Sequence, residues 1–167
     1  MGVNRLQVGI IGSSAGGHLA ATVLAYHDRG QANASDPIDR VRYANSKRKC
    51  KDPNINIHPP NQFIKLAWHS SRPSFGVLVY PVIAMEQGDP IVHATSRLML
   101  LGPNLTTAED ARLGWHYSID KHVHPNRDFP PTFVFVPEDD MEVKPENSYR
   151  MAAALAAAKV MIDSDGI

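Results

Sequence analysis

The chain has 167 residues, of which 43% are hydrophobic and 20% charged, a globular composition that excludes general disorder. Its 17 basic and 17 acidic residues cancel, so overall charge favours neither nucleic acid nor an anionic membrane surface as a partner. No apolar run is long enough for a transmembrane helix, and we expect no membrane association. The N-terminus lacks the apolar core of a signal peptide, although a truncated N-terminus could have lost one. A single cysteine, Cys50, excludes an intramolecular disulfide. We therefore expect a cytoplasmic location.

Strands and helices are predicted to alternate along the chain. Residues 6–11 are apolar and β-branched up to Gly12, and their near-continuous hydrophobicity predicts a strand buried on both faces. A helix rich in small residues follows at 15–26. Two further buried strands are predicted at 75–80 and 132–136, and further helices at 93–101, from Thr106 to about Asp120, and at 145–159. This alternation predicts a three-layer α/β/α domain with a parallel sheet of about three strands.

Residues 42–69 differ in composition from their surroundings. They contain a Pro59-Pro60 pair and scattered asparagines, which predict an irregular loop. Their charge is biased, with a single acid, Asp52, against the basic residues Arg42, Lys47, Arg48, Lys49, Lys51 and Lys65. Long loops of this kind are either mobile surface insertions or functional segments. We interpret this one as a solvated basic insertion, with a contact to an anion or a partner as the alternative.

The residues Gly12-Ser13-Ser14-Ala15-Gly16 match the pattern G-x-S-x-G between a predicted strand and a predicted helix. This pattern is typical of a tight turn that exposes a nucleophilic serine at the carboxyl edge of a sheet. Bulky side chains at Gly12 or Gly16 are expected to collide in such a turn. The N–H of Ala15, at the helix N-terminus, could stabilise a developing oxyanion. The alternative is a phosphate-binding turn, but no lysine follows and the spacing is not G-x-G-x-x-G.

Acidic residues follow the third predicted strand at Glu138-Asp139-Asp140. Because the carboxyl ends of parallel strands share one edge of a sheet, a carboxylate here lies on the same edge as the serine turn. That is where the orienting acid of a catalytic triad belongs. The alternative is that these acids cap the next helix.

Several stretches resemble, in the same order, the α/β-hydrolase esterases of the acetylxylan-esterase or lipase/esterase type. The resemblance covers most of the chain outside residues 42–69. It is strongest from Val8 to Ala20, around the serine turn, and from Ser71 to Ile83. It continues at shorter stretches, namely residues 36–41, 100–102, 130–133, 139–140 and 146–148.

The resemblance implies a role for each matching residue. Ser14 matches the nucleophile, Ala15 supplies one oxyanion N–H, and Gly12 and Gly16 form the elbow turn. Asp140 matches the triad acid, with Asp139 as the alternative if the register slips by one. Glu142 and Lys144 depart from the family pattern beside that acid. The family's further oxyanion loop precedes the elbow and its triad histidine follows a later strand. Neither is found, so the chain resembles a fragment of the domain with 42–69 inserted.

No catalytic histidine is identified among the eight histidines of the chain. His18 matches a family position that is not the triad base, and we expect it to pack or to form a hydrogen bond near the site. His122 and His124 alternate as metal ligands can, but a third ligand at suitable spacing is missing, so no metal is predicted. His93 and His116 are interpreted as surface or core residues.

Taken together, these features predict a serine carboxylesterase-type hydrolase of small acyl esters, particularly acetyl groups on carbohydrate, with no cofactor. The alternative is a catalytically silent hydrolase fragment or binding module that lacks the catalytic histidine. Whether the chain is an enzyme by itself stays open, since a serine without a base keeps little nucleophilicity. Self-association is expected, because strands that would flank residues 6–11 in the full fold are not identified.

Overall fold

The computed structural model describes residues 8–27, 72–124, 129–160 and 162–163. The chain divides into two units, one formed by residues 1–26 and 73–167 and the other by residues 27–72. The predicted basic insertion at 42–69 falls in the second unit and lies outside the described residues.

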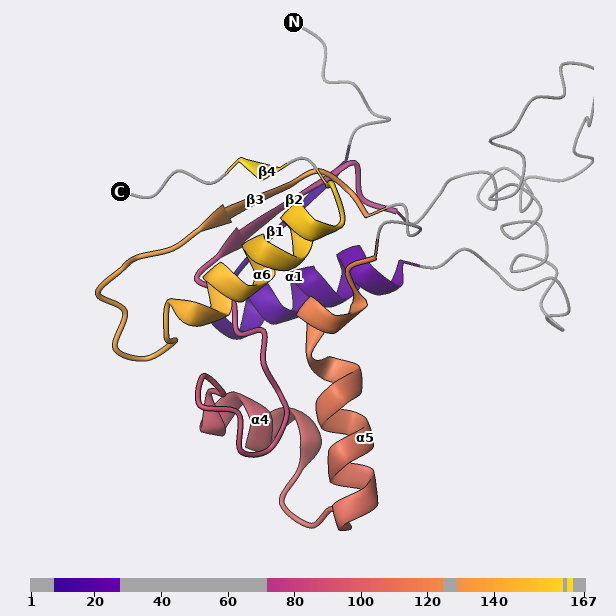
Figure 1. Ribbon diagram of the computed structural model, residues 1–167, viewed down its shortest axis with the longest axis vertical. Helices are drawn as coiled ribbons and strands as arrows, with labels where there is room; N and C mark the ends of the chain where they lie inside the picture. Colours follow the sequence, from indigo (N-terminus) through magenta and orange to yellow (C-terminus); the bar gives the residue numbers. More distant parts are fainter. Residues whose placement is uncertain (1–7, 28–71, 125–128, 161, 164–167) are drawn as a thin grey trace, which may run out of the picture. The chain divides into compact units, whose positions relative to one another are not determined.

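The sheet of the first unit is parallel, as predicted. Its strands are β1 (Gly9–Ser13), β2 (Phe75–Val79), β3 (Thr132–Phe135) and β4 (Ile162–Asp163), in the order β1-β2-β3-β4 (Figure 1). Three of these strands confirm the predicted ones. The two-residue β4 was not predicted, since so short a strand leaves no pattern in the sequence. Because Ser13, Val79 and Phe135 are in register, the carboxyl ends of β1, β2 and β3 lie side by side.

The helices follow the predicted order closely. They are α1 (Ser14–Tyr26), α4 (Ala94–Leu101), α5 (Thr107–Tyr117) and α6 (Glu146–Ala157), with a 3-10 turn, η1, at Ile119–His122. Thr106 and Glu109 form the predicted capping box of α5. The helix predicted to reach Asp120 ends three residues earlier, at Tyr117, and continues as η1 after Ser118.

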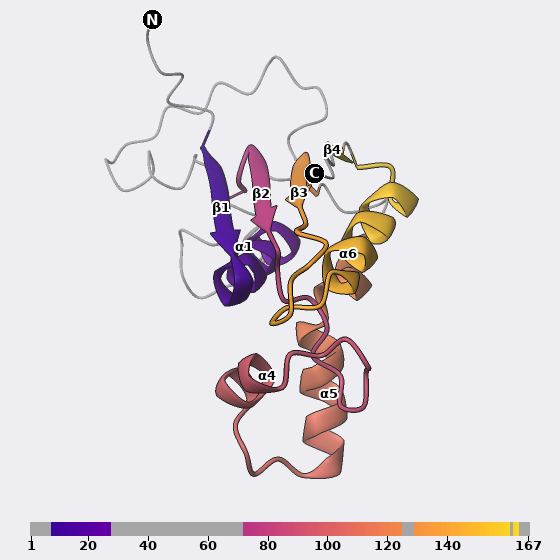
Figure 2. The same ribbon diagram turned by 90° about the vertical axis from the view of Figure 1, so that its left-hand side faces the viewer.

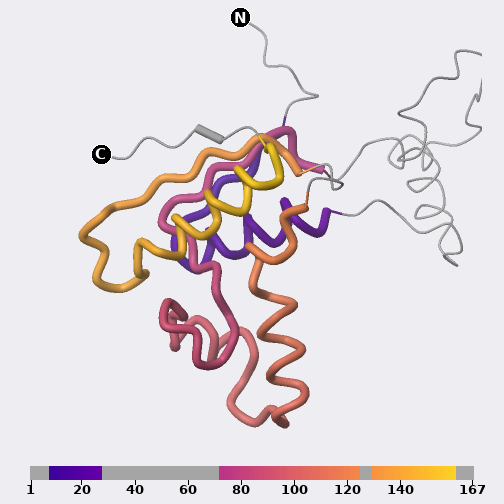
Figure 3. The backbone as a smooth tube through the Cα atoms, in the orientation of Figure 1, coloured from indigo at the N-terminus to yellow at the C-terminus, as the bar shows by residue number. Residues whose placement is uncertain are grey.

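The hydrophobic core lies between the sheet and the helices α1, η1 and α6. Leu78 of β2 and Val134 of β3 are neighbours in register and form the sheet side of this core. Small residues of α1, including Ala20 and Ala21, allow the helix to lie close to the sheet. A Cβ on Gly76 of β2 would overlap the side chain of Leu24. Figure 3 shows the backbone of α1 and α6 on the same side of the strands.

The opposite face of the described sheet is open. Ile11 is 72% exposed, and Phe75, which pairs with Gly9 at the start of β2, is 47% exposed. The expectation that the first strand is buried on both faces is therefore wrong. The physical reason is that the described helices that pack on the sheet belong to one core, on one face. The described residues thus provide the sheet and one helix layer of the α/β fold.

Helices α4 and α5 lie beyond the end of the sheet toward which β1 and β2 point (Figure 2). They therefore stand on the carboxyl side of the sheet, where the predicted serine turn is. None of the helices in the described part of the chain is both long and apolar enough to cross a membrane.

Candidate functional site

The turn between β1 and α1 has the strained backbone that the G-x-S-x-G pattern predicts. Strand β1 ends at Ser13 and α1 begins at Ser14, with no residue between them. Ser14 has a φ of +53°, in the left-handed region that non-glycine residues rarely occupy. Such strain costs about 1–3 kcal/mol and is concentrated at functional sites. The turn places a half-buried serine at the carboxyl edge of the sheet.

The glycines of this turn have different roles. A Cβ on Gly12 would overlap the backbone carbonyl of Gly16, so strand and helix can approach only if residue 12 is glycine. A Cβ on Gly16 itself would meet no atom within 4 Å, and the expected collision at Gly16 is therefore wrong. Its backbone, not its side-chain position, is crowded. Gly17, which the sequence reasoning did not single out, would place a Cβ 2.8 Å from Cα of Pro81.

Ala15 is exposed in the first turn of α1. First-turn N–H groups have no acceptor within their own helix, and the helix dipole adds partial positive charge there. The Ala15 N–H is therefore available to a negative oxygen formed next to Ser14, as an oxyanion hole requires.

The segment that follows β2, residues 80–91, is hydrogen-bonded to the serine turn. Tyr80 also has a left-handed backbone, with a φ of +37°, and its N–H donates to Phe135 O at 2.8 Å. Two residues later, the Val82 N–H donates to Ser14 O at 3.2 Å. The Val82 carbonyl lies 3.1 Å from Nδ1 of His18. The elbow is therefore bonded directly to the chain leaving the neighbouring strand.

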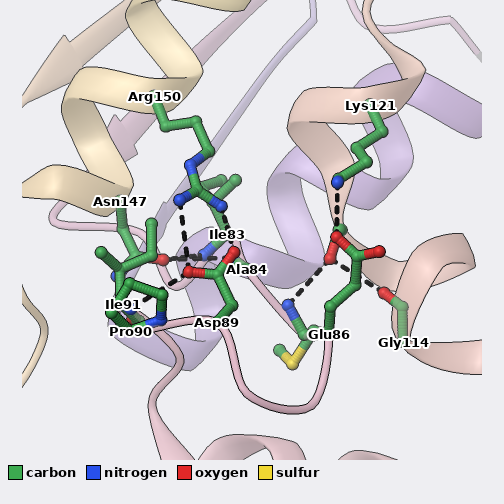
Figure 4. Close-up of polar contacts among 12 residues, drawn as sticks. Ile83, Ala84, Glu86, Asp89, Pro90, Ile91, Gly114, Lys121, Asn147 and Arg150 are labelled. Atoms are coloured by element: carbon green, nitrogen blue, oxygen red, sulfur yellow. Dashed lines mark hydrogen bonds and ion pairs between the residues drawn. The ribbon is translucent and has the colours of Figure 1, made fainter. Parts of the chain in front are cut away.

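Asn147 of α6 forms hydrogen bonds to the same segment after β2 (Figure 4). Its side chain is fully buried, and its Oδ1 accepts from the N–H groups of Ile83 at 2.9 Å and Ala84 at 3.0 Å. Its Nδ2 donates to Ile91 O at 2.8 Å and to Lys144 O at 3.2 Å. The sequence reasoning placed Asn147 in the family resemblance but gave it no role.

Ser118 and two ion pairs add to this support. Ser118 Oγ accepts from the Met85 N–H at 2.9 Å and donates to Gly114 O at 2.8 Å. Arg150 pairs with Asp89, and the guanidinium holds the pKa of that carboxyl below its ordinary value. Lys121 pairs with Glu86 (Figure 4). Residues 80–91 are thus fixed to α1, α6 and η1 by their backbone and side chains.

The predicted acids lie beyond the carboxyl end of β3. Asp139 is exposed, whereas Asp140 is half-buried. Oδ1 of Asp140 accepts from the N–H groups of Glu142 at 2.8 Å and Val143 at 2.9 Å. These bonds orient the carboxylate of Asp140, while Asp139 makes no comparable bond in the described part of the chain. Asp140 is thus the one of the two acids whose carboxylate is held, by N–H groups of the turn that follows it.

Four histidines in the described part of the chain pack, stack, cap a helix or form hydrogen bonds within the fold. His122 is buried with Nε2 3.1 Å from Trp115 O, while His124 is exposed, so the two do not act as a pair. His116 stacks on Tyr26, with ring centroids 4.9 Å apart. His93 caps α4 by accepting from the Ser96 N–H, a role that the sequence reasoning missed. His18 is 6% exposed, which confirms the expectation of a packed, hydrogen-bonded residue near the elbow.

The burial of His18 predicts a pH-dependent stability. Burial lowers the pKa of His18 below 6.5, so the unfolded chain binds a proton more readily than the folded chain. The free energy of unfolding should therefore fall as pH drops below 6.5, and level off below the folded-state pKa. Urea unfolding of wild type and His18→Asn across pH 4.5–7.5 checks this.

The difference in unfolding free energy between the two proteins removes the contribution of Asp120. Burial raises the pKa of Asp120, so its effect on stability upon acidification has the opposite sign to that of His18. We expect wild type to lose stability relative to His18→Asn on acidification. A difference that stays constant with pH would contradict the prediction.

Comparisons with known proteins agree with this geometry, although no family model matches the chain. An acetyl ester-xyloside bifunctional hydrolase from Caldicellulosiruptor lactoaceticus superposes with a TM-score of 0.67 at 30% identity, covering 97% of this chain and 46% of that one. The carboxylesterase Cest-2923 from Lactobacillus plantarum gives 0.54 at 26% identity, covering 97% and 44%. In sequence, endo-1,4-beta-xylanase B from Butyrivibrio fibrisolvens is 38% identical over 91 residues, or 54% of this chain and 13% of that protein.

These comparisons confirm the resemblance found in the sequence. A truncated carbohydrate esterase from gut microbiota shares the fold, with a TM-score of 0.60 at 16% identity. The solved esterases align with nearly the whole of this chain, while the chain spans 46% of the Caldicellulosiruptor hydrolase and 44% of Cest-2923. The chain therefore has part of the α/β-hydrolase fold and is similar in sequence to esterases of that fold.

Proposed function

We propose that the chain carries the nucleophile of a serine ester hydrolase. The observation that carries this proposal is the left-handed Ser14 between β1 and α1, at the carboxyl edge of a parallel sheet. Gly12 permits the close approach of strand and helix, and Ala15, an exposed residue in the first turn of α1, directly follows the serine. This arrangement suits attack on an ester carbonyl and stabilisation of the negative oxygen that forms.

The proposed reaction has two steps. Ser14 Oγ attacks the acyl carbon while a general base takes its proton, and the Ala15 N–H donates to the oxyanion; the C–O bond to the alcohol then breaks as the base gives that proton to the leaving alcohol. Water next attacks the acyl-serine and gives a proton to the base, and this proton passes to Ser14 Oγ as the carboxylic acid leaves. Asp140 is the proposed orienting acid. In the described part of the chain no histidine bonds to Ser14 or Asp140, so the base is not assigned.

The proposed substrates are small acyl esters, in particular acetyl groups on carbohydrate. This substrate class is supported by the names of the relatives, one an acetyl ester-xyloside hydrolase and another a xylanase. No cofactor is part of the proposed reaction. A cytoplasmic location is proposed from the single cysteine.

The test supplies the unassigned base from solution. The chain is mixed with p-nitrophenyl acetate, with and without excess imidazole, beside Ser14→Ala as control. Without imidazole we expect activity within about tenfold of Ser14→Ala, because loss of a triad member costs several orders of magnitude. With imidazole we expect turnover that Ser14→Ala does not show. A Ser14-dependent rate on the order of a thousandfold without imidazole would mean that a histidine of this chain serves as base.

The alternative function is a silent hydrolase fragment or a binding module. The observation that favours it is the missing histidine partner of Ser14 in the described residues. In that case imidazole would produce no Ser14-dependent turnover, while an acetylated xylo-oligosaccharide would still bind. The Ser14-dependent turnover with imidazole separates the two functions, and calorimetric titration of wild type and Ser14→Ala with that oligosaccharide measures the binding that a module without activity would keep.

We also propose that the chain is one partial hydrolase domain with an insertion at 42–69, and that it self-associates. β1 is an edge strand of the described sheet; Val8, directly before it, is 66% exposed, and Ile11, within it, is 72% exposed. Exposed apolar edges are templates for pairing with another chain. We expect light scattering after size-exclusion chromatography to show dimers or larger species. A monodisperse monomer with a cooperative melt above about 60 °C would contradict this.

A further inference from the structure

The buried histidine of α1 has a bond that links it to the serine turn. His18 is 6% exposed, and its Nδ1 lies 3.1 Å from Val82 O. Because a carbonyl can only accept, Nδ1 carries the proton and Nε2 carries the lone pair. That Nε2 atom is buried and has no hydrogen-bond partner among the described residues.

The unpaired Nε2 atom indicates which property of His18 matters at this position. A buried polar atom without a partner costs about 1–3 kcal/mol. A leucine would fill a similar volume without that cost. The feature of the histidine that leucine lacks is the Nδ1–H, and its one described acceptor is the Val82 carbonyl. The bond to Val82 is therefore the property that the histidine adds at this position.

The Val82 peptide is held by α1 through both of its polar groups. Its carbonyl accepts from His18, and its N–H donates to Ser14 O at 3.2 Å. Gly17 lies against Pro81 between these two bonds, where a Cβ would come within 2.8 Å of Pro81 Cα. Ser14 and His18, which lie one turn apart on α1, thus both bond to the Val82 peptide in the segment after β2, and we call these three residues the clamp.

We propose that His18 is a positioning residue for Ser14, acting through the Val82 peptide. It fixes Val82, and the Val82 N–H in turn fixes the carbonyl of the strained serine. The position of Ser14 Oγ relative to the Ala15 N–H depends on that turn. This proposal rests on the proposed esterase function only for its kinetic consequence, since the clamp itself can be tested without activity.

The test compares His18→Leu, which removes the Nδ1–H donor, with His18→Asn, whose Nδ2 can donate from a similar distance. The first measurement is hydrogen exchange at the Val82 amide. With His18→Leu we expect exchange at least about tenfold faster, because opening of the clamp exposes the Val82 N–H. The amides of α5, which lie outside the clamp, should exchange as in wild type. His18→Asn should restore most of the protection at Val82.

The second measurement is Ser14 acylation by p-nitrophenyl acetate in the presence of imidazole, as a function of ester concentration. Misplacement of a reacting group by about 1 Å costs up to about a hundredfold in rate. We expect His18→Leu to lower the maximal acylation rate at least about tenfold, with a half-saturating concentration close to wild type. His18→Asn should recover the rate to within about threefold.

The outcomes separate the two proposals. If the wild-type chain shows no Ser14-dependent acylation, the proposed function fails, while altered Val82 exchange would still support the clamp. If His18→Leu keeps the wild-type protection at Val82, the positioning role is overturned. The same holds if His18→Leu and His18→Asn lose rate and protection equally, since that result would mean that the ring only fills space.

Discussion

Replacing Gly12 with alanine is expected to lower the free energy of unfolding by about 3 kcal/mol or more, at the upper end of overpacking effects. The added Cβ would overlap the backbone carbonyl of Gly16, and a backbone atom cannot move aside as a flexible side chain can. Relief would require α1 to shift away from β1, and the Ser14 turn would shift with it. Urea unfolding followed by circular dichroism measures the loss.

Gly16→Ala is the matched control. The same methyl group is added in the same turn, but it would meet no atom within 4 Å, and Gly16 has no left-handed backbone. We expect stability to stay unchanged or to rise by up to about 1 kcal/mol, because alanine is the better helix former. Equal losses in the two variants would contradict the assigned geometry of the turn.

Asn147→Ala is the second change with a large expected effect. It would leave the N–H groups of Ile83 and Ala84, and the carbonyl of Ile91, without their described side-chain partner. Each unsatisfied buried group costs about 1–3 kcal/mol, so we expect a loss of about 3 kcal/mol or more. Thermal and urea unfolding would measure it.

The control for this variant is Asn104→Ala. Asn104 is exposed, and we expect its replacement to change stability by less than about 0.5 kcal/mol. Asn147→Asp keeps the acceptor for Ile83 and Ala84 but loses both donors, so we expect an intermediate or similar loss. Near-wild-type stability of Asn147→Ala would mean that the segment after β2 is held mainly by other contacts.

The sequence predicted the elements and the turn well, because those depend on short-range patterns. The change from a β-branched run to small residues at Gly12 marked the junction of strand and helix, and the structure places Ser14 there. Thr106 and Glu109 form the capping box that their spacing of three residues predicts. Each of these features needs only residues that are neighbours in the chain.

Features that depend on long-range contacts could not be predicted. The role of Asn147 requires Ile83 and Ala84, which are 64 and 63 residues away. The clamp of His18 and Val82 likewise joins residues 64 apart. The prediction that β1 is buried on both faces was wrong. A hydrophobic sequence shows that a face of the strand can be buried, but it does not show which helix covers that face. The G-x-S-x-G pattern predicted a steric collision at both glycines, but only a Cβ on Gly12 would collide, and a Cβ on Gly16 would meet no atom within 4 Å.

The central claim is that the turn after β1 presents Ser14, and not its neighbour Ser13, as a nucleophile. Site mapping of the adduct formed with a fluorophosphonate in the presence of imidazole tests it most directly. We expect a single adduct on Ser14 that disappears in Ser14→Ala and remains in Ser13→Ala. An adduct on Ser13, an adduct spread over several surface hydroxyls, or no adduct while the chain is folded would contradict the claim.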